Sequence, residues 1–134
     1  MFIAYIGLCV MILGGMVYTQ YSDFVAERET TYIKLNSYAK FSGVFHKLND
    51  RWPANFMEVV LIRKTDRSTT DFYGFEIEYE PYDEDKGYGS VISYGKDGKV
   101  GGDKGAEQDI HVRFPIEKYK AWNETQFYGK PRSN

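Results

Sequence analysis

Apolar side chains fill the first part of the chain without interruption. Met1 to Tyr18 contain no charged residue and are rich in Ile, Leu, Val, Met and Gly. At about 1.5 Å per helical residue, a run of this length nearly crosses a hydrocarbon core of about 30 Å. Tyr18 and Tyr21 follow where aromatic side chains favour the membrane interface. We therefore expect a transmembrane helix over residues 1–21. A cleaved secretory signal is the competing interpretation, but the run has no basic flank and no small-x-small cleavage site after it.

Beyond this run the apolar positions recur at steps of three or four, the spacing of one face of an α-helix. No proline occurs before Pro53, so the membrane run and an amphipathic segment over residues 22–49 are expected to form one unbroken helix. Asn49-Asp50 and then Trp52-Pro53 end it, because the residue before a proline disfavours helical backbone. We expect the stripe to cover the domain's own sheet; its members are Phe24, Arg28, Thr31, Leu35, Tyr38, Phe41, Phe45 and Leu48.

The segment 50–114 predicts a short helix and then strands. Asn55 begins a helical pattern that extends to Arg63, with Glu58 as its capping-box partner. Three later stretches have the composition or alternation of strands: FYGFEIEYEP (72–81), YGSVISYG (88–95) and DIHVRFPI (109–116). In the first, the expected buried positions are Phe75, Ile77 and Tyr79, and the expected wet positions are Glu76, Glu78 and Glu80. We therefore expect an α+β fold, in which a long N-terminal helix packs on a small antiparallel sheet with a glycine-rich C-terminal loop.

Composition narrows the function. The chain has 134 residues, 43% of them hydrophobic and 17% aromatic, and a formal net charge of -2. This balance is typical of one folded domain and lacks the positive charge that nucleic-acid phosphates attract. The one cysteine, Cys9, lies in the apolar run, so no intrachain disulfide can form and a Cys-His nucleophile is not expected. P-loop, zinc-ligand and nucleophile-elbow patterns are absent. We expect neither an enzyme nor a small-molecule substrate.

Several polar and aromatic residues have plain structural interpretations. His46 is expected on the long helix and His111 on a strand, each as a structural histidine because no convergent partners accompany it. The acidic residues at 76–85 are expected to form a solvated face rather than a cation or basic-partner site. For the tail, residues 115–134, two alternatives stay open: its aromatics pack back on the domain, or they dock a partner. These aromatics are Tyr119, Trp122, Phe127 and Tyr128.

The stretch SYGKDGKVGGDKGAEQDI, residues 93–110, places five glycines and four acidic side chains in 18 positions. Calcium takes about 6 to 8 oxygen ligands from carboxylates and backbone carbonyls. Glycines let a backbone direct several carbonyls at one point. Three lysines nearly cancel the negative charge, however, and the spacing is not that of an EF-hand. The residues alone leave open a calcium loop and an unmetallated hairpin loop with solvated charges.

A family resemblance rests on motifs in a fixed order after the long helix. They are Trp52-Pro53, Asp71 with Tyr73-Gly74, and then Ser93, Gly95, Asp97, Gly98, Gly101, Gly102, Asp109 and Ile110. Over roughly residues 20–114 the chain resembles the major pseudopilins of type II secretion systems, which are relatives of type IV pilins. The resemblance implies a calcium ion in the glycine-rich loop. Its implied ligands are Asp97 and Asp109, the Tyr94 carbonyl, and Asp103 and Glu107 as additional carboxylates.

The resemblance also implies a function and a location. It implies a non-enzymatic structural subunit with a single span in the inner membrane, its soluble domain (22–134) in the periplasm. Identical or related subunits would pack through the N-terminal helix into a pilus-like filament or secretion apparatus for protein transport, beside other membrane-complex proteins. The lysines and arginine after the run would by themselves favour a cytoplasmic domain.

The N-terminal segment departs from the family pattern. Family members lose a short basic leader and carry Glu at the fifth mature position, where this chain has Tyr5. Either the numbering begins at a processed end, or the chain is a stably anchored relative. The alternative function is therefore a single-span accessory or adaptor subunit of a larger membrane complex, without metal or polymerisation.

Overall fold

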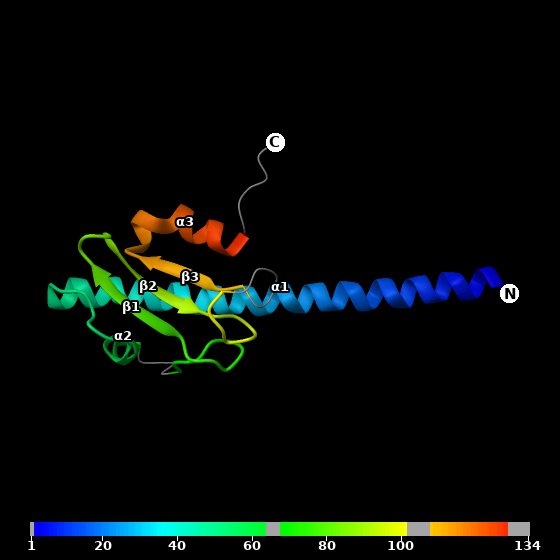
Figure 1. The fold of residues 1–134 in the computed structure, drawn as a ribbon, viewed down its shortest axis with the longest axis horizontal. Helices are drawn as coiled ribbons and strands as arrows, with labels where there is room; N and C mark the ends of the chain where they lie inside the picture. Colours follow the sequence, from blue (N-terminus) through cyan, green and yellow to red (C-terminus); the bar gives the residue numbers. More distant parts are fainter. Residues whose placement is uncertain (1, 64–67, 102–107, 129–134) are drawn as a thin grey trace.

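A computed structural model of the chain describes residues 2–63, 68–101 and 108–128, and their side chains except those of 2–5, 21, 24 and 125–128. The fold is α+β, as expected: one long helix carries a three-stranded antiparallel sheet and two shorter helices on its C-terminal half (Figure 1). The elements are α1 (Phe2–Asn49), α2 (Phe56–Ile62), β1 (Glu78–Asp83), β2 (Tyr88–Ser93), β3 (Ile110–Phe114) and α3 (Ile116–Tyr128).

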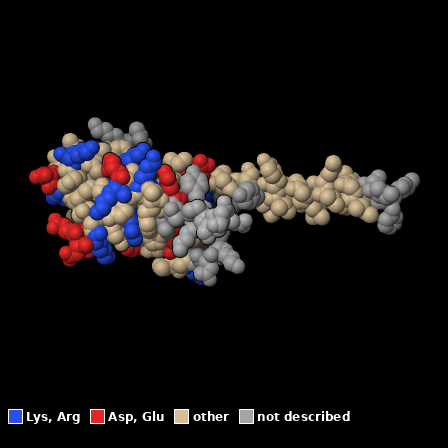
Figure 2. All heavy atoms as spheres, turned by 90° about the horizontal axis from the view of Figure 1, so that it is seen from above, with Lys and Arg blue, Asp and Glu red and all other residues tan. Residues whose placement is uncertain are grey.

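Helix α1 is unbroken over 48 residues, and its N-terminal half protrudes beyond the domain. Apolar side chains on this half are exposed, Met11 to 79% and Val17 to 66%. Figure 2 shows the protruding half with no acidic or basic side chain over most of its length. By length and composition α1 is able to cross a membrane. The one-helix prediction is therefore confirmed.

The C-terminal half of α1 buries one face against the sheet. Leu35 and Tyr38 are fully buried, and Thr31 and Ser42 extend the same face at steps of three and four. The prediction for Leu48 is wrong, because its side chain is 73% exposed. Phe45 already lies at the edge of the buried arc, and three more residues turn the helix about 60° further away from the sheet.

The sheet has the order β1-β2-β3. In the β2–β3 pairing Val91 lies opposite Val112, and both side chains are fully buried on the α1 side. Helix α2 closes the same core from below the sheet in Figure 1 through Val59 and Val60. The core joins apolar side chains from four elements, α1, α2, β2 and β3, and from the segment before β1: Leu35, Tyr38, Ala39, Val59, Val60, Ile77, Val91, Ile110, Val112 and Phe114.

Strand β1 begins later than its alternating pattern predicts. Ile77 is buried as expected, but Phe75 is 41% exposed. The backbone N–H groups of Tyr73 and Phe75 both donate to Asp71 Oδ1, at 2.9 and 3.0 Å. This carboxylate holds residues 71–75 in a turn, so the first member of the predicted alternation is not in a strand. Within the described residues 68–77, an isolated bridge, Thr70 to Glu76, is the only strand-like pairing before β1.

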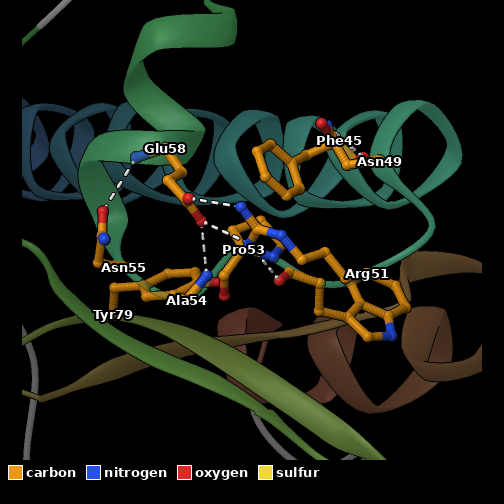
Figure 3. A network of polar contacts seen from close by, with 9 residues as sticks. Phe45, Asn49, Arg51, Pro53, Ala54, Asn55, Glu58 and Tyr79 are labelled. Atoms are coloured by element: carbon orange, nitrogen blue, oxygen red, sulfur yellow. Dashed lines mark hydrogen bonds and ion pairs between the residues drawn. The ribbon is translucent and has the colours of Figure 1, made fainter.

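Residues 49–58, the distal turn, reverse the chain between α1 and α2 (Figure 3). The Arg51 guanidinium donates two hydrogen bonds to the Glu58 carboxylate, at 2.8 and 3.0 Å. The predicted N-cap is confirmed, since Asn55 Oδ1 accepts the Glu58 N–H at 3.1 Å. The second capping-box bond differs: the Glu58 carboxylate accepts the N–H of Ala54, at 2.8 Å, one residue before the cap. The Arg51 ion pair and this bond use both carboxylate oxygens.

Aromatic rings fill the space beneath the distal turn. Trp52 stacks between His46 and Tyr82, with ring centroids 4.2 and 4.8 Å away. The Tyr79 hydroxyl donates to the Pro53 carbonyl at 2.9 Å. His46 lies on α1, as predicted, and its ring contributes to this stack. The distal turn is therefore held by polar and aromatic contacts that the domain supplies itself.

The tail contains a helix that the sequence did not predict. Asn123 on α3 is 1% exposed and pairs with the backbone of Arg113 on β3, accepting its N–H at 2.8 Å and donating to its carbonyl at 3.0 Å. The rings of Tyr119 and Trp122 also lie on the domain, which decides between the two alternatives for these residues. The side chains of Phe127 and Tyr128 lie outside the described residues. The sequence did not show the apolar spacing of an amphipathic helix here, because a buried position of α3 holds the polar Asn123.

Candidate functional site

The described parts of the glycine-rich loop (94–109), residues 94–101 and 108–109, lie at the end of the domain from which the protruding half of α1 emerges (Figure 1). We name this end of the domain the loop end. A partly buried guanidinium joins the loop to α1, because Arg28 Nη1 donates to the Gln108 carbonyl at 3.0 Å. Burial lowers the pKa of Arg28 from its ordinary value, and the nearby Tyr73 partly offsets this. The contact ties the end of the loop to the segment of α1 that leads into the apolar run.

A buried carboxylate anchors the start of the loop. Asp71, 5% exposed, accepts the Ser93 hydroxyl on its Oδ2 at 2.7 Å, while its Oδ1 holds the turn before β1. Ser93 Oγ in turn accepts the Gly95 N–H at 3.3 Å. A buried carboxylate needs such donors to offset its lost hydration. Asp71 and Ser93 therefore fix the point at which the chain leaves β2.

Two glycines give the first turn of the loop its shape. Gly95 and Gly98 have φ angles of 74° and 64°, in the left-handed region, and the Gly98 N–H donates to the Gly95 carbonyl at 3.2 Å. A Cβ at Gly98 would lie 2.5 Å from the Phe75 ring. Inside this turn Asp97 Oδ1 accepts the Lys99 N–H at 3.0 Å. In this turn the backbone at Gly98 lies close to the Phe75 ring, and the Asp97 carboxylate uses Oδ1 for the Lys99 N–H, which leaves Oδ2 for another ligand.

Asp109 closes the loop from its other end. Its Oδ2 accepts the Gly101 N–H at 2.8 Å. Its Oδ1 is buried and has no hydrogen-bond partner among the described residues. A buried carboxylate oxygen without a donor is unfavourable, and a cation is one way to satisfy it. The Asp109 carboxylate is therefore suited to act as one of the hard oxygen ligands that calcium requires.

Tyr94 connects the loop to the outer strand through its hydroxyl, which donates to a carboxylate oxygen of Glu78. Burial, the Glu78 hydrogen bond and nearby carboxylates raise the pKa of Tyr94 to about 12. The phenol is therefore protonated at neutral pH and acts as a donor. The predicted contribution of Tyr94 to a metal, its backbone carbonyl, stays a prediction.

The structure describes three of the five predicted ligands. Asp97, Asp109 and Tyr94 are described, and both carboxylates accept N–H groups of the loop. Asp103 and Glu107 lie outside the described residues. Within the described ranges no group of three or more His, Cys, Asp or Glu side chains is placed to hold a metal ion.

The residues that anchor the two ends of the loop, Asp71 with Ser93 at its start and Arg28 at its end, were not predicted as site residues. Asp71 and Ser93 belong to the motif order of the pseudopilin resemblance, so a signal for them existed. For Arg28 the only signal was a charged residue within an otherwise apolar stripe. His111 lies on β3, as predicted; burial lowers its pKa, although carboxylates including Asp109 oppose the shift.

Comparisons with known proteins leave the family undetermined. No family model matches the chain, and none of the curated proteins and none of the solved structures shows significant similarity to it.

Proposed function

We propose that the protein is a membrane-anchored structural subunit of the pseudopilin kind, which assembles through its N-terminal helix into a pilus-like filament or secretion apparatus. The observation that carries the proposal is helix α1, unbroken for 48 residues. Its exposed apolar half suits lipid and neighbouring helices, while its other half forms the spine of a small α+β domain. One rigid helix of this kind transmits the position of the membrane segment to the domain.

Small residues on the apolar half support packing between copies. Gly7 and Gly14 are seven residues apart, which places them on one face of α1. A Cβ at either position would meet no atom within 4 Å, so the backbone is open to a neighbour. Transmembrane helices associate closely where small residues let their backbones approach. In the pseudopilin arrangement the domain would be periplasmic and the helix would lie in the inner membrane.

Calcium is the second part of the proposal. The Asp97 and Asp109 carboxylates would bind it with the Tyr94 carbonyl, and Asp103 and Glu107 would add ligands from the rest of the loop. The partnerless Asp109 Oδ1 supports this assignment. Binding would stabilise the folded domain by RT ln(1 + [Ca]/Kd), because the unfolded chain has no assembled ligand set. A fixed loop would offer neighbouring subunits one defined surface.

Cross-linking at Cys9 tests the assembly. Cys9 is the only cysteine and is exposed on α1. Oxidation of membranes that contain the full chain is expected to give disulfide-linked dimers, and Met16→Cys in addition is expected to give a ladder of higher species. Cys9→Ser alone is the control and should give none. Heterogeneous adducts without a homo-oligomeric ladder would contradict the filament.

Thermal unfolding tests the metal. The full chain in detergent micelles is expected to melt at a higher temperature with excess calcium than with chelator. Asp97→Ala and Asp109→Ala should each remove the difference, whereas the exposed Asp85→Ala should keep it. Identical melting curves for the unchanged chain, with and without calcium, would exclude a structural metal in this loop.

One observation favours a second function. Residues 1–22 contain no acidic side chain, whereas pseudopilins carry a glutamate in the membrane segment that pairs with a neighbouring subunit's amine. A single-span adaptor in a complex of unlike chains does not need that pairing. The adaptor predicts cross-links from Cys9 to other proteins and no calcium-dependent melting.

A further inference from the structure

Arg113 on β3 has an unusual environment on the face of the sheet turned away from α1. Its guanidinium carbon lies 3.9 Å from the ring centre of Tyr88 on β2 and 3.7 Å from that of Trp122 on α3. Both rings are close enough for cation–π attraction, which holds the guanidinium in place. The Arg113 backbone is fixed as well, because Asn123 pairs with both its N–H and its carbonyl. Side chain and backbone are therefore positioned before any ligand arrives.

The donors of this guanidinium have no partner in the part of the chain that the structure describes. Among the described residues, no hydrogen bond or ion pair engages the Arg113 side chain; the one ion pair found there joins Arg51 and Glu58. A guanidinium carries five N–H donors in a plane, and aromatic stacking leaves the edges of that plane available. Such an edge matches the two oxygens of a carboxylate in a bidentate pair.

A pocket of about 360 Å³ opens beside Arg113. Its volume falls at the lower end of the range for small-ligand sites, about 300–1,000 Å³. Ser90, 3% exposed, lines it from the central strand, and the strand register places Ser90 between Glu80 and Arg113. The side chains around the pocket are those of Glu80, Lys86, Tyr88, Ser90, His111, Arg113 and Trp122.

We propose that this pocket is a binding site for a carboxylate group, which Arg113 would receive on its free edge, with the Lys86 ammonium and the Ser90 hydroxyl as further donors. The charges set the ligand class. Lys86 and Arg113 contribute two positive charges and Glu80 one negative charge, so one carboxylate neutralises the pocket. A dianionic phosphate would leave an excess negative charge beside Glu80 and is disfavoured.

The test uses the full chain in detergent micelles and NMR signals of Trp122 and His111, which neighbour Arg113 but are not replaced. Sodium acetate, titrated against chloride at constant ionic strength, is expected to shift both signals to saturation. Inorganic phosphate under the same conditions should bind more weakly. Shifts that do not saturate, or equal shifts with chloride alone, would overturn the proposal.

Variants separate a binding site from a packing contact. Arg113→Gln should weaken acetate binding about tenfold or more, and Arg113→Lys should restore little of it, since an ammonium has no planar fork. Glu80→Gln should tighten binding, because it removes the opposing charge. Lys47→Gln, on the exposed end of α1, is the matched control and should change nothing. If Arg113→Lys bound acetate as well as the unchanged chain, the bidentate assignment would be wrong.

The carboxylate has two possible sources, a free acid or an acidic side chain of a second copy. Dilution distinguishes them. If the Trp122 signal shifts with protein concentration in the absence of acetate, and acetate reverses the shift, the natural ligand is a neighbouring chain. A concentration-independent signal that still responds to acetate assigns the site to a free carboxylic acid.

Discussion

The two ends of the domain satisfy their carboxylates in different ways. At the distal turn, the Glu58 oxygens accept from Arg51 and from the Ala54 N–H, and aromatic stacking closes the space beneath. At the loop end, the contacts described for Asp97 and Asp109 come from N–H groups of the loop, and Asp109 Oδ1 has no described partner. At the distal turn both Glu58 oxygens are therefore satisfied by the protein, although His46 Nδ1 in the stack is buried without a described partner. The loop end has protein anchors at Asp71 and Arg28 and a buried carboxylate oxygen without a described partner, so the two ends should respond differently to calcium and to substitution.

The largest effect is expected at the loop anchor. Asp71→Ala leaves three donors without their acceptor, the N–H groups of Tyr73 and Phe75 and the Ser93 hydroxyl. We expect a loss of about 4 kcal/mol in the free energy of unfolding, measured by urea titration of the full chain in micelles. The calcium response should disappear with it. Asp71→Asn keeps one acceptor oxygen and should lose less; equal losses for both variants would contradict the anchor.

Alanine substitutions at Gly89, near the distal end, and at Gly98, in the loop, compare the two ends directly. A Cβ at Gly89 would lie 2.2 Å from the ring of Phe114, which is fully buried, so Gly89→Ala is expected to cost about 2 kcal/mol or more. At Gly98 the obstructing ring is Phe75, which is 41% exposed and free to turn away. There the left-handed φ of 64° dominates, at about 1 kcal/mol.

The same urea titration, with calcium and with chelator, checks both glycine variants. Gly89→Ala should lose the same stability in each condition, whereas Gly98→Ala should lose more with calcium present, because it also disturbs the loop. A larger loss at Gly98 than at Gly89 in chelator would reverse the ranking.

The smallest effect is a pH dependence at the distal turn. Hydrogen bonds from Arg51 and from the Ala54 N–H lower the pKa of Glu58 to about 2. A lowered carboxyl pKa adds stability that is complete above the ordinary value of 4.5 and is lost as the pH falls through about 2. Glu58→Gln should therefore flatten the acid side of the stability profile slightly, since the pair is exposed and screened by water. Glu84→Gln should leave the profile unchanged.

The sequence predicted an element correctly where a local signal in that element determined its structure. The absence of proline before Pro53 was enough for the long helix, and Asn55 was enough for the start of α2. It failed where long-range contacts decided. The turn at Phe75 depends on Asp71, and helix α3 depends on one asparagine that meets the backbone of β3.

The same distinction between local signals and long-range contacts applies to the residues of the candidate site. Glycine and acidic residues marked the loop, and the pseudopilin resemblance selected Asp97 and Asp109. The sequence could not show that Arg28, 80 positions earlier, bonds to Gln108, since that contact exists only after α1 lies along the sheet. The contacts of the Arg113 guanidinium with the rings of Tyr88 and Trp122 likewise join three separate elements.

The Asn123 contact has a consequence for how copies of the domain can meet. Strand β3 is an edge of the sheet, and an unprotected edge invites another chain to add a strand. Asn123 occupies the N–H and the carbonyl of Arg113, as a neighbouring strand would do. The opposite edge, β1, carries Pro81 and a register irregularity, which also disfavour strand addition. With both edges blunted, copies of the domain brought close together would be protected from fusing into a continuous sheet.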